Sequence, residues 1–213
     1  MMILCQYGME MQRQIRNAIH CAMLSALCVG TVNATESLNV VTRHNAPEEV
    51  ALKARVEAVV VRYQLGKWLY TKDIRIDKDA WPPHSHPVLT LGVRKAMPDD
   101  DLYLVGSLLH EQFHWHMVLN SKFMPDETRA LVQAKFPGLD PRQPKGSGDE
   151  SSTYNHVLVC YMEYKALAGI FGEAAALSAI KSHPFYTGIY ALIADKQNQE
   201  VIEDLLRQEE LSF

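Results

Sequence analysis

The stretch DDDLYLVGSLLHEQFHWHMVLN, residues 99–120, decides the fold and holds the most informative motif of the chain. Three aspartates open it, and carboxylates favour a helix N-terminus because they accept hydrogen bonds from its free N–H groups and complement the helix dipole. Apolar side chains then recur at roughly helical spacing, at Leu102, Val105, Leu109, Phe113 and Val118. The pattern predicts one long, partly buried helix in the middle of the chain.

The predicted helix carries an H-E-x-x-H motif, His110-Glu111-Gln112-Phe113-His114. Histidines four residues apart lie on one face of a helix, so both imidazoles can reach one tetrahedral metal ion. Glu111 lies about 100° round the helix from His110, near a water on the metal but outside the ligand positions. The motif predicts a Zn²⁺ site with His110 and His114 as ligands and Glu111 as catalytic base. An accidental match is the alternative, and a third ligand downstream would argue against it.

The expected helix Thr153–Phe171 offers two candidates for that third ligand, His156 and Glu163. They share a helix face but lie about 10 Å apart along its axis, so we expect only one of them to bind the metal. We favour Glu163, because a carboxylate among the apolar residues of CYMEYKAL needs a strong partner. His156 would then be a catalytic residue that stabilises the oxyanion. The competing interpretation pairs Glu163 with a basic residue and buries His156 in the core.

Other histidines and tyrosines carry weaker signals. His84 and His86 could form a second metal site, although exposed loop histidines are the commoner case. His116 points off the ligand face, and we expect it to be exposed or to support a ligand. Tyr186 and Tyr190 share a helix face, where a hydroxyl could assist the oxyanion, but core packing is the favoured interpretation.

The rest of the chain predicts a small sheet and several helices. Alternation in 73–77 and the apolar run 88–92 indicate two strands. Helices are expected at 47–65, at 126–136, at 153–171 with Ser151 or Ser152 as cap, and two or three times within 173–210, with a loop at 137–150. We therefore expect an α+β fold, a mostly helical domain over residues 35–213 with a small β-sheet beside the motif helix.

The first 34 residues have the composition of a signal peptide. A short basic region precedes the uncharged segment Asn17–Val32, and Val32-Asn33-Ala34 places small or apolar residues at a cleavage site. An N-terminal membrane anchor is the alternative. We expect cleavage and export to the periplasm or the medium, with no membrane span in the mature chain. Cys160 would be the one cysteine left, which excludes an internal disulfide.

Composition narrows the classes of partner. The chain has 213 residues, of which 47% are hydrophobic and 22% charged, as in ordinary globular proteins. A formal net charge of −4 and a pI near 6.1 provide no basic surface for nucleic acid. We therefore expect no DNA or RNA partner.

Three segments together resemble a known group of enzymes: HSHPVLTLG, LLHEQFHW and YNHVLVCYMEYKAL. They are similar to an uncharacterised bacterial family of predicted zinc-dependent metallopeptidases and, more broadly, to the gluzincin branch of the zincins, over roughly His84–Tyr190. The resemblance implies His110, His114 and Glu163 as metal ligands and Glu111 as base. It also implies that the strand at 88–91 binds extended peptide.

The chain departs from two better defined patterns. Met162 and Leu167 stand where thermolysin-type gluzincins have an asparagine and an aspartate around the ligand glutamate. Met117 and Asn120 stand where metzincins have a glycine and a third histidine. The expected function is a zinc-dependent hydrolase, a metallopeptidase that acts on a peptide or protein with a zinc-bound water activated by Glu111. A zinc-binding interaction protein without peptidase activity is the alternative.

Overall fold

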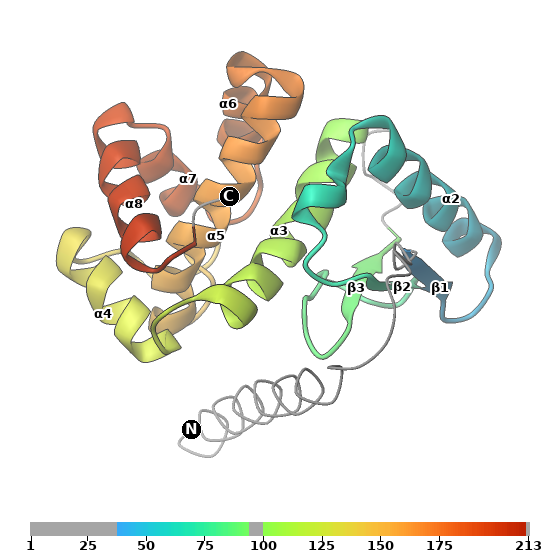
Figure 1. Ribbon diagram of the computed structural model, residues 1–213, viewed down its shortest axis with the longest axis horizontal. Coiled ribbons are helices and arrows are strands. Elements are labelled where there is room, and N and C mark those ends of the chain that lie inside the picture. Colours follow the sequence, from blue (N-terminus) through green and yellow to red (C-terminus); the bar gives the residue numbers. More distant parts are fainter. Residues whose placement is uncertain (1–37, 94–99, 212–213) are drawn as a thin grey trace, which may run out of the picture. The chain divides into compact units, whose positions relative to one another are not determined.

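The structure is a computed structural model that describes residues 38–93 and 100–211, so the expected signal peptide, residues 1–34, lies outside the described residues. The described residues belong to one compact unit, Leu38–Phe213 (Figure 1). Its elements are β1 (Asn39–Thr42), α2 (Pro47–Arg62), the 3₁₀ turn η1 (Leu65–Trp68), β2 (Asp73–Asp77), β3 (Leu89–Gly92), α3 (Asp101–Asn120), α4 (Pro125–Lys135), α5 (Glu150–Phe171), α6 (Glu173–Ser182), α7 (Thr187–Ile193) and α8 (Lys196–Gln208). The prediction of a mostly helical α+β fold is confirmed.

The sheet has three parallel strands in the order β1-β2-β3. Strand β2 buries Ile74 and Ile76 and exposes Asp73 and Arg75, as the alternating sequence predicts, although its last residue, Asp77, is also buried. Strand β1 was not predicted, because it has four residues and only Val40 is buried, which leaves no alternation to detect. Helix α2 makes the crossover from β1 to β2 that a parallel pair requires.

Helix α2 ends earlier than the sequence suggested. It stops at Arg62 rather than Leu65, because Gln64 adopts a left-handed backbone with φ of 52°. Leu65 then begins the turn η1 and is fully buried, which explains why the apolar pattern continued past the end of the helix.

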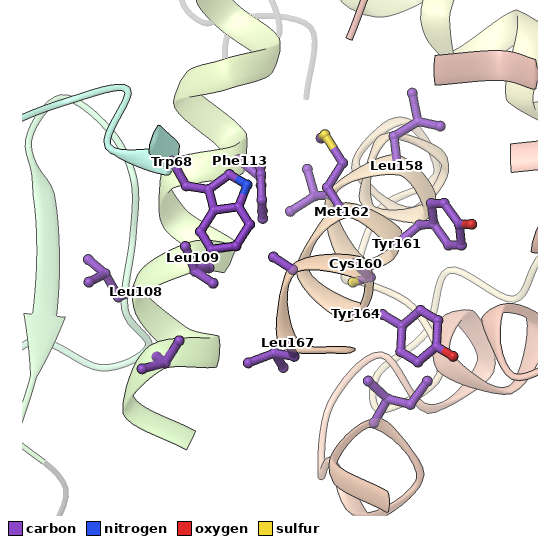
Figure 2. Close-up of a cluster of buried hydrophobic side chains, with 14 of the residues drawn as sticks. Trp68, Leu108, Leu109, Phe113, Leu158, Cys160, Tyr161, Met162, Tyr164 and Leu167 are labelled. Carbon is purple, nitrogen blue, oxygen red and sulfur yellow. The ribbon is translucent and has the colours of Figure 1, made fainter. Parts of the chain in front are cut away.

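Helix α3 is the predicted motif helix and contacts both β3 and α5. The side chain of Asp100 caps it by accepting a hydrogen bond from the backbone N–H of Leu102 at 2.8 Å. In Figure 2, Leu108 points from α3 toward the strands, whereas Met162 and Leu167 point from α5 toward α3. The motif helix is therefore packed between the sheet and the helical part of the unit, beside the sheet as predicted.

Helix α5 is the centre of the helical part, with contacts to α3, α4, α6, α7 and α8. It begins at Glu150, because Asp149 accepts a hydrogen bond from the backbone N–H of Ser152 at 2.8 Å. The expected caps Ser151 and Ser152 lie inside the helix instead. Within the described ranges, no helix is long and apolar enough to cross a membrane.

Of the two expectations for His116, exposure is wrong, because only 5% of its surface is accessible. Its hydrogen-bond partners, Leu211 and Asn120, are not candidate ligands either. Its ring stacks on Tyr70 at 4.2 Å between centroids. Its Nε2 donates to the carbonyl oxygen of Leu211 at 3.3 Å, while Nδ1 lies 2.8 Å from the amide nitrogen of Asn120. His116 thus ties the C-terminal segment to α3 and takes no part in the motif's face.

Candidate metal centre

Three histidines from two helices converge where α3 packs against α5. The ligand atoms of His110, His114 and His156 all lie within 4.8 Å of one another, a grouping that could hold a metal ion. The ring centroids are 5.1 Å apart for His110 and His114, 5.5 Å for His110 and His156, and 4.8 Å for His114 and His156. Both His110 and His156 are buried. The helical spacing of the motif thus brings two possible ligands together, and α5 adds a third.

The backbone of α5 fixes which nitrogen of His156 carries the proton. Nδ1 of His156 lies 2.7 Å from the carbonyl oxygen of Ser152, one turn earlier. A carbonyl oxygen only accepts hydrogen bonds, so Nδ1 carries the proton and Nε2 keeps its lone pair. Metal-binding histidines commonly donate their second nitrogen to a carbonyl in this way. His156 is therefore oriented as a ligand.

The buried carboxylate of Glu163 likewise fixes the ring orientation of His110. Nδ1 of His110 lies 2.9 Å from Oε2 of Glu163, and the hydroxyl of Tyr190 donates to that same oxygen at 2.7 Å. Burial is the largest influence on the hydroxyl of Tyr190 and, together with the negative charges nearby, raises its pKa well above the ordinary value, so it remains a donor. Glu163 and Tyr190 thus fix the orientation of the His110 ring through Nδ1.

The structure brings all five predicted site residues together, but it groups them differently from the expectation. Glu163 belongs to a second, fully buried group with His110 and Cys160. Among the described residues, no such group joins Glu163 to His114. The partners of Glu163 are His110 and Tyr190, and the alternative in which Glu163 pairs with a basic residue fits the same contact with His110.

Glu111 lies beside the three histidines and lines a cleft with His110. Burial raises the pKa of the Glu111 carboxyl to about 7; the positive charge of His110 opposes this shift and the negative charge of Glu163 adds to it. A carboxyl group with such a pKa can exchange a proton with water near neutral pH, which a general base must do.

The same burial favours neutral imidazoles at two of the three histidines. It lowers the pKa of His156 to about 3 and that of His114 well below the ordinary value, and the positive charge of His110 adds to both shifts. Burial also opposes charge on His110, but hydrogen bonds and charges from Cys160 and Glu163 outweigh it and raise the pKa of His110 well above normal. A metal ligand must be neutral, so His114 and His156 are held in the binding form.

Residues between and after the motif histidines anchor α3. Gln112 is fully buried and makes two hydrogen bonds with the backbone of Thr71, at 2.8 and 2.9 Å. The indole of Trp115 donates to the carbonyl oxygen of Ser85 at 2.8 Å. These bonds tie the motif helix to the chain before β2 and to the loop before β3.

Gly106 allows α5 to approach α3 at the site. A Cβ at this position would lie 3.2 Å from Oε1 of Glu163, which is tighter than an ordinary contact. Gly106 stands one turn before His110, so the missing side chain leaves room for the carboxylate that orients His110. In the sequence, Gly106 interrupts an otherwise good helix pattern, and that is the signal that could have indicated a close approach.

Tyr186 and Tyr190 are both at the site, although core packing was the favoured expectation. The ring of Tyr186 stacks on His156 at 4.6 Å and on His110 at 5.4 Å between centroids. Tyr186 has a left-handed backbone with φ of 57°, which is uncommon for a residue other than glycine. Burial raises the pKa of its hydroxyl, so the group stays protonated. The predicted shared helix face is wrong, because Tyr186 is the N-cap of α7 and only Tyr190 lies within that helix. Their partners on α3 and α5 could not be read from the sequence.

His84 and His86 belong to the loop before β3. His84 exchanges two backbone hydrogen bonds with Thr90, at 2.8 and 3.1 Å, and His86 stacks on Trp115 at 4.4 Å. Among the described residues, neither joins a group of possible metal ligands. The bridge also occupies the outer edge of β3 at Thr90, the strand that the gluzincin resemblance implies as a binder of extended peptide.

A third group of possible ligands, His44, Glu49 and Asp77, lies far from the motif. Glu49 is fully buried and already accepts hydrogen bonds from the backbone N–H groups of His44, Ala46 and Lys78. Asp77 is paired with Arg43 at 2.6 Å. These carboxylates hold the start of α2 against the end of β2, so the group has a structural explanation.

Comparisons with protein-family models, curated proteins and solved structures find no match to this chain. The resemblance to gluzincins is therefore carried by the motifs alone. What the geometry gives is a set of buried and partly buried residues that could hold a metal ion, near a carboxyl group of raised pKa.

Proposed function

We propose that this chain is a zinc-dependent hydrolase, a metallopeptidase, in which His110, His114 and His156 hold the metal. The observation that carries the proposal is the convergence of these three imidazoles within 4.8 Å, beside Glu111. Imidazole nitrogens suit zinc, and three protein ligands leave a fourth coordination position for water or substrate, as in catalytic zinc sites. The donor set therefore fits the metal that the motif predicts.

In this proposal His156 takes the ligand role that was expected of Glu163 from the sequence, and Glu163 takes a positioning role that the sequence did not predict. His156 becomes the third ligand, because its Nδ1 is held by the carbonyl of Ser152 and its Nε2 is left for the metal. Glu163 becomes a positioning residue, because its Oε2 is already shared between His110 and Tyr190. This assignment keeps both residues in one site and gives each buried polar side chain a partner.

The chemistry follows from what the side chains can do. A bound Zn²⁺ supplies a Lewis acid for the substrate carbonyl and lowers the pKa of water toward neutrality. Glu111 accepts a proton from the attacking water and can pass it to the leaving amine, which its pKa of about 7 permits. Tyr186 lines the same cleft with a protonated hydroxyl that can donate a hydrogen bond to the substrate oxygen.

The first test separates binding of the metal from catalysis. Metal content is measured on the purified wild type, on Glu111→Gln and on the matched surface variant Glu200→Gln, together with hydrolysis of a mixed peptide library with and without chelator. We expect about one zinc per chain in all three, and a loss of at least 100-fold in turnover only for Glu111→Gln, because a general base contributes 10²–10⁴-fold.

Two results would overturn the proposal. Absence of stoichiometric zinc from the wild type would remove the metal centre itself. Zinc without chelator-sensitive hydrolysis would instead favour a zinc-binding interaction protein.

Export to the periplasm or the medium stays a prediction from the first 34 residues. If the chain is exported, the proposed peptidase would cleave peptides outside the cytoplasm.

A further inference from the structure

Cys160, His110 and Glu163 form a second group of possible metal ligands, beside the three histidines. Their ligand atoms all lie within 4.8 Å of one another, and all three side chains are buried. Cys160 lies on α5 (Figure 2), about one turn before Glu163, and its thiol interacts with His110 and Tyr190. Nδ1 of His110 lies 2.9 Å from Oε2 of Glu163. The group thus gathers a sulfur, a nitrogen and an oxygen donor at one place.

We propose that this group is a second metal site, the inner site, which binds a divalent cation of the zinc class through Sγ of Cys160, Nδ1 of His110 and the carboxylate of Glu163. Cysteine, histidine and glutamate side chains are all accepted as zinc ligands in proteins. The two sites share His110, because an imidazole ring has two nitrogens. The inner site goes beyond the proposed hydrolase, since neither Cys160 nor Glu163 belongs to the three-histidine group.

The charges of the donors select the class of cation. A bound thiolate and a bound carboxylate each carry one negative charge, so Cys160 and Glu163 together neutralise a divalent ion. Such compensation is required where all the ligands are buried, because an unpaired charge in the interior is costly. Mg²⁺ and Ca²⁺ prefer oxygen ligands, whereas a thiolate selects softer ions. The donor set therefore fits zinc or its heavier homologue cadmium.

The neighbours of Glu163 support a ligand carboxylate. The hydroxyl of Tyr190 donates to Oε2 of Glu163 at 2.7 Å, and carboxylates that bind metals commonly accept such a second hydrogen bond. Gly106 leaves room for the other oxygen, because a Cβ there would lie 3.2 Å from Oε1. His110 and Glu163 also line a cleft of about 240 Å³, through which an ion can reach them.

The inner site should fill after the three-histidine site. An ion there replaces the hydrogen bond between His110 and Glu163. It also displaces protons from the thiol of Cys160 and from Nδ1 of His110, and these protons pass to the buffer. Both changes weaken binding, so we expect the first zinc at the three histidines and an ion in the inner site only when metal is in excess.

The test is a titration of the full chain, loaded with one equivalent of zinc, with Co²⁺. Zinc has a filled d shell and gives no absorption band, and cobalt does not readily displace it because cobalt binds such sites more weakly. We expect a thiolate-to-cobalt charge-transfer band in the near ultraviolet, which Cys160→Ala abolishes. Glu163→Gln should weaken the cobalt binding that produces the band by at least about tenfold.

Two control variants locate the band. The chain has three other cysteines, Cys5, Cys21 and Cys28, and replacing all three by alanine should leave the band unchanged. His114→Ala, which removes a ligand of the three-histidine site alone, should also keep the band. Circular dichroism checks that Cys160→Ala is folded, and if it is not, Glu163→Gln decides the matter.

Three results would overturn the inner site: no band in excess cobalt, a band that survives in folded Cys160→Ala, or a band that Glu163→Gln leaves at full affinity. A band lost in His114→Ala would also contradict it, because the thiol would then belong to a single mixed site. Each of these results leaves the proposed hydrolase to its own test. A band that depends on Cys160 in a chain that cleaves no peptide would contradict the hydrolase alone.

Discussion

At the scale of single residues, the identity of the third ligand, His156 or Glu163, distinguishes two possible arrangements of the metal centre. If His156 binds the metal and Glu163 orients His110, then His156→Ala should lose stoichiometric zinc, because it removes one of three ligands. Glu163→Gln should keep zinc with an affinity reduced about 10–100-fold, the usual cost of losing a group that supports a ligand. Competition with a chromophoric chelator measures both affinities.

The control for this pair is His84→Ala, which removes an exposed loop histidine that belongs to no ligand group. It should bind zinc as the wild type does. If Glu163→Gln loses zinc and His156→Ala retains it, Glu163 is the third ligand, as the sequence suggested. That result would refute the assignment of His156 as the third ligand.

At the scale of helices, the site depends on how closely α3 and α5 approach at Gly106. An alanine there would press on Oε1 of Glu163, whose other oxygen is held by His110 and Tyr190 and cannot shift freely. We expect Gly106→Ala to weaken zinc binding by about 3–10-fold, below the 10–100-fold cost of losing a supporting group outright. Alanine also favours a helix over glycine by about 1 kcal/mol, so the thermal stability should not fall in parallel.

The matched control is Gly169→Ala on α5, where a Cβ would meet nothing within 4 Å. This variant should gain stability from helix propensity and keep the affinity for zinc, as measured by thermal unfolding and the same chelator competition. If Gly106→Ala bound zinc as tightly as Gly169→Ala, the close approach would have no role in orienting His110.

The helices also explain how far the sequence could predict this site. The motif residues His110, Glu111 and His114 follow from spacing on one helix, because the period of 3.6 residues fixes which side chains share a face. The contribution of α5 does not follow, since His156 and Glu163 share a face of that helix and only its packing on α3 decides which of them faces the two rings. Strand β1 escaped prediction for a related reason, because four residues with one buried side chain have no detectable period.

At the scale of the whole molecule, we expect the folded unit to be stable without the metal. The core combines apolar residues of the sheet, α3 and α5, such as Ile76, Leu109, Phe113 and Leu158, all of them fully buried. Figure 2 shows the cluster that contains the last three. A unit of this size can be stable from such a core without a metal staple. The candidate ligands connect two helices that apolar contacts already hold together, so a metal would add to an existing structure.

The last prediction follows from this independence. Removing the metal with a chelator should leave the far-UV circular dichroism spectrum unchanged, because the core remains. Zinc at 100 times its dissociation constant stabilises the folded state by about 2.7 kcal/mol, and a unit of this length gains about 2–4 °C per kcal/mol, so the Tm should rise by about 5–10 °C. His156→Ala should abolish the rise. If the chain instead unfolds when the chelator is added, the metal is structural. That result would argue against a catalytic metal that leaves one coordination position for water.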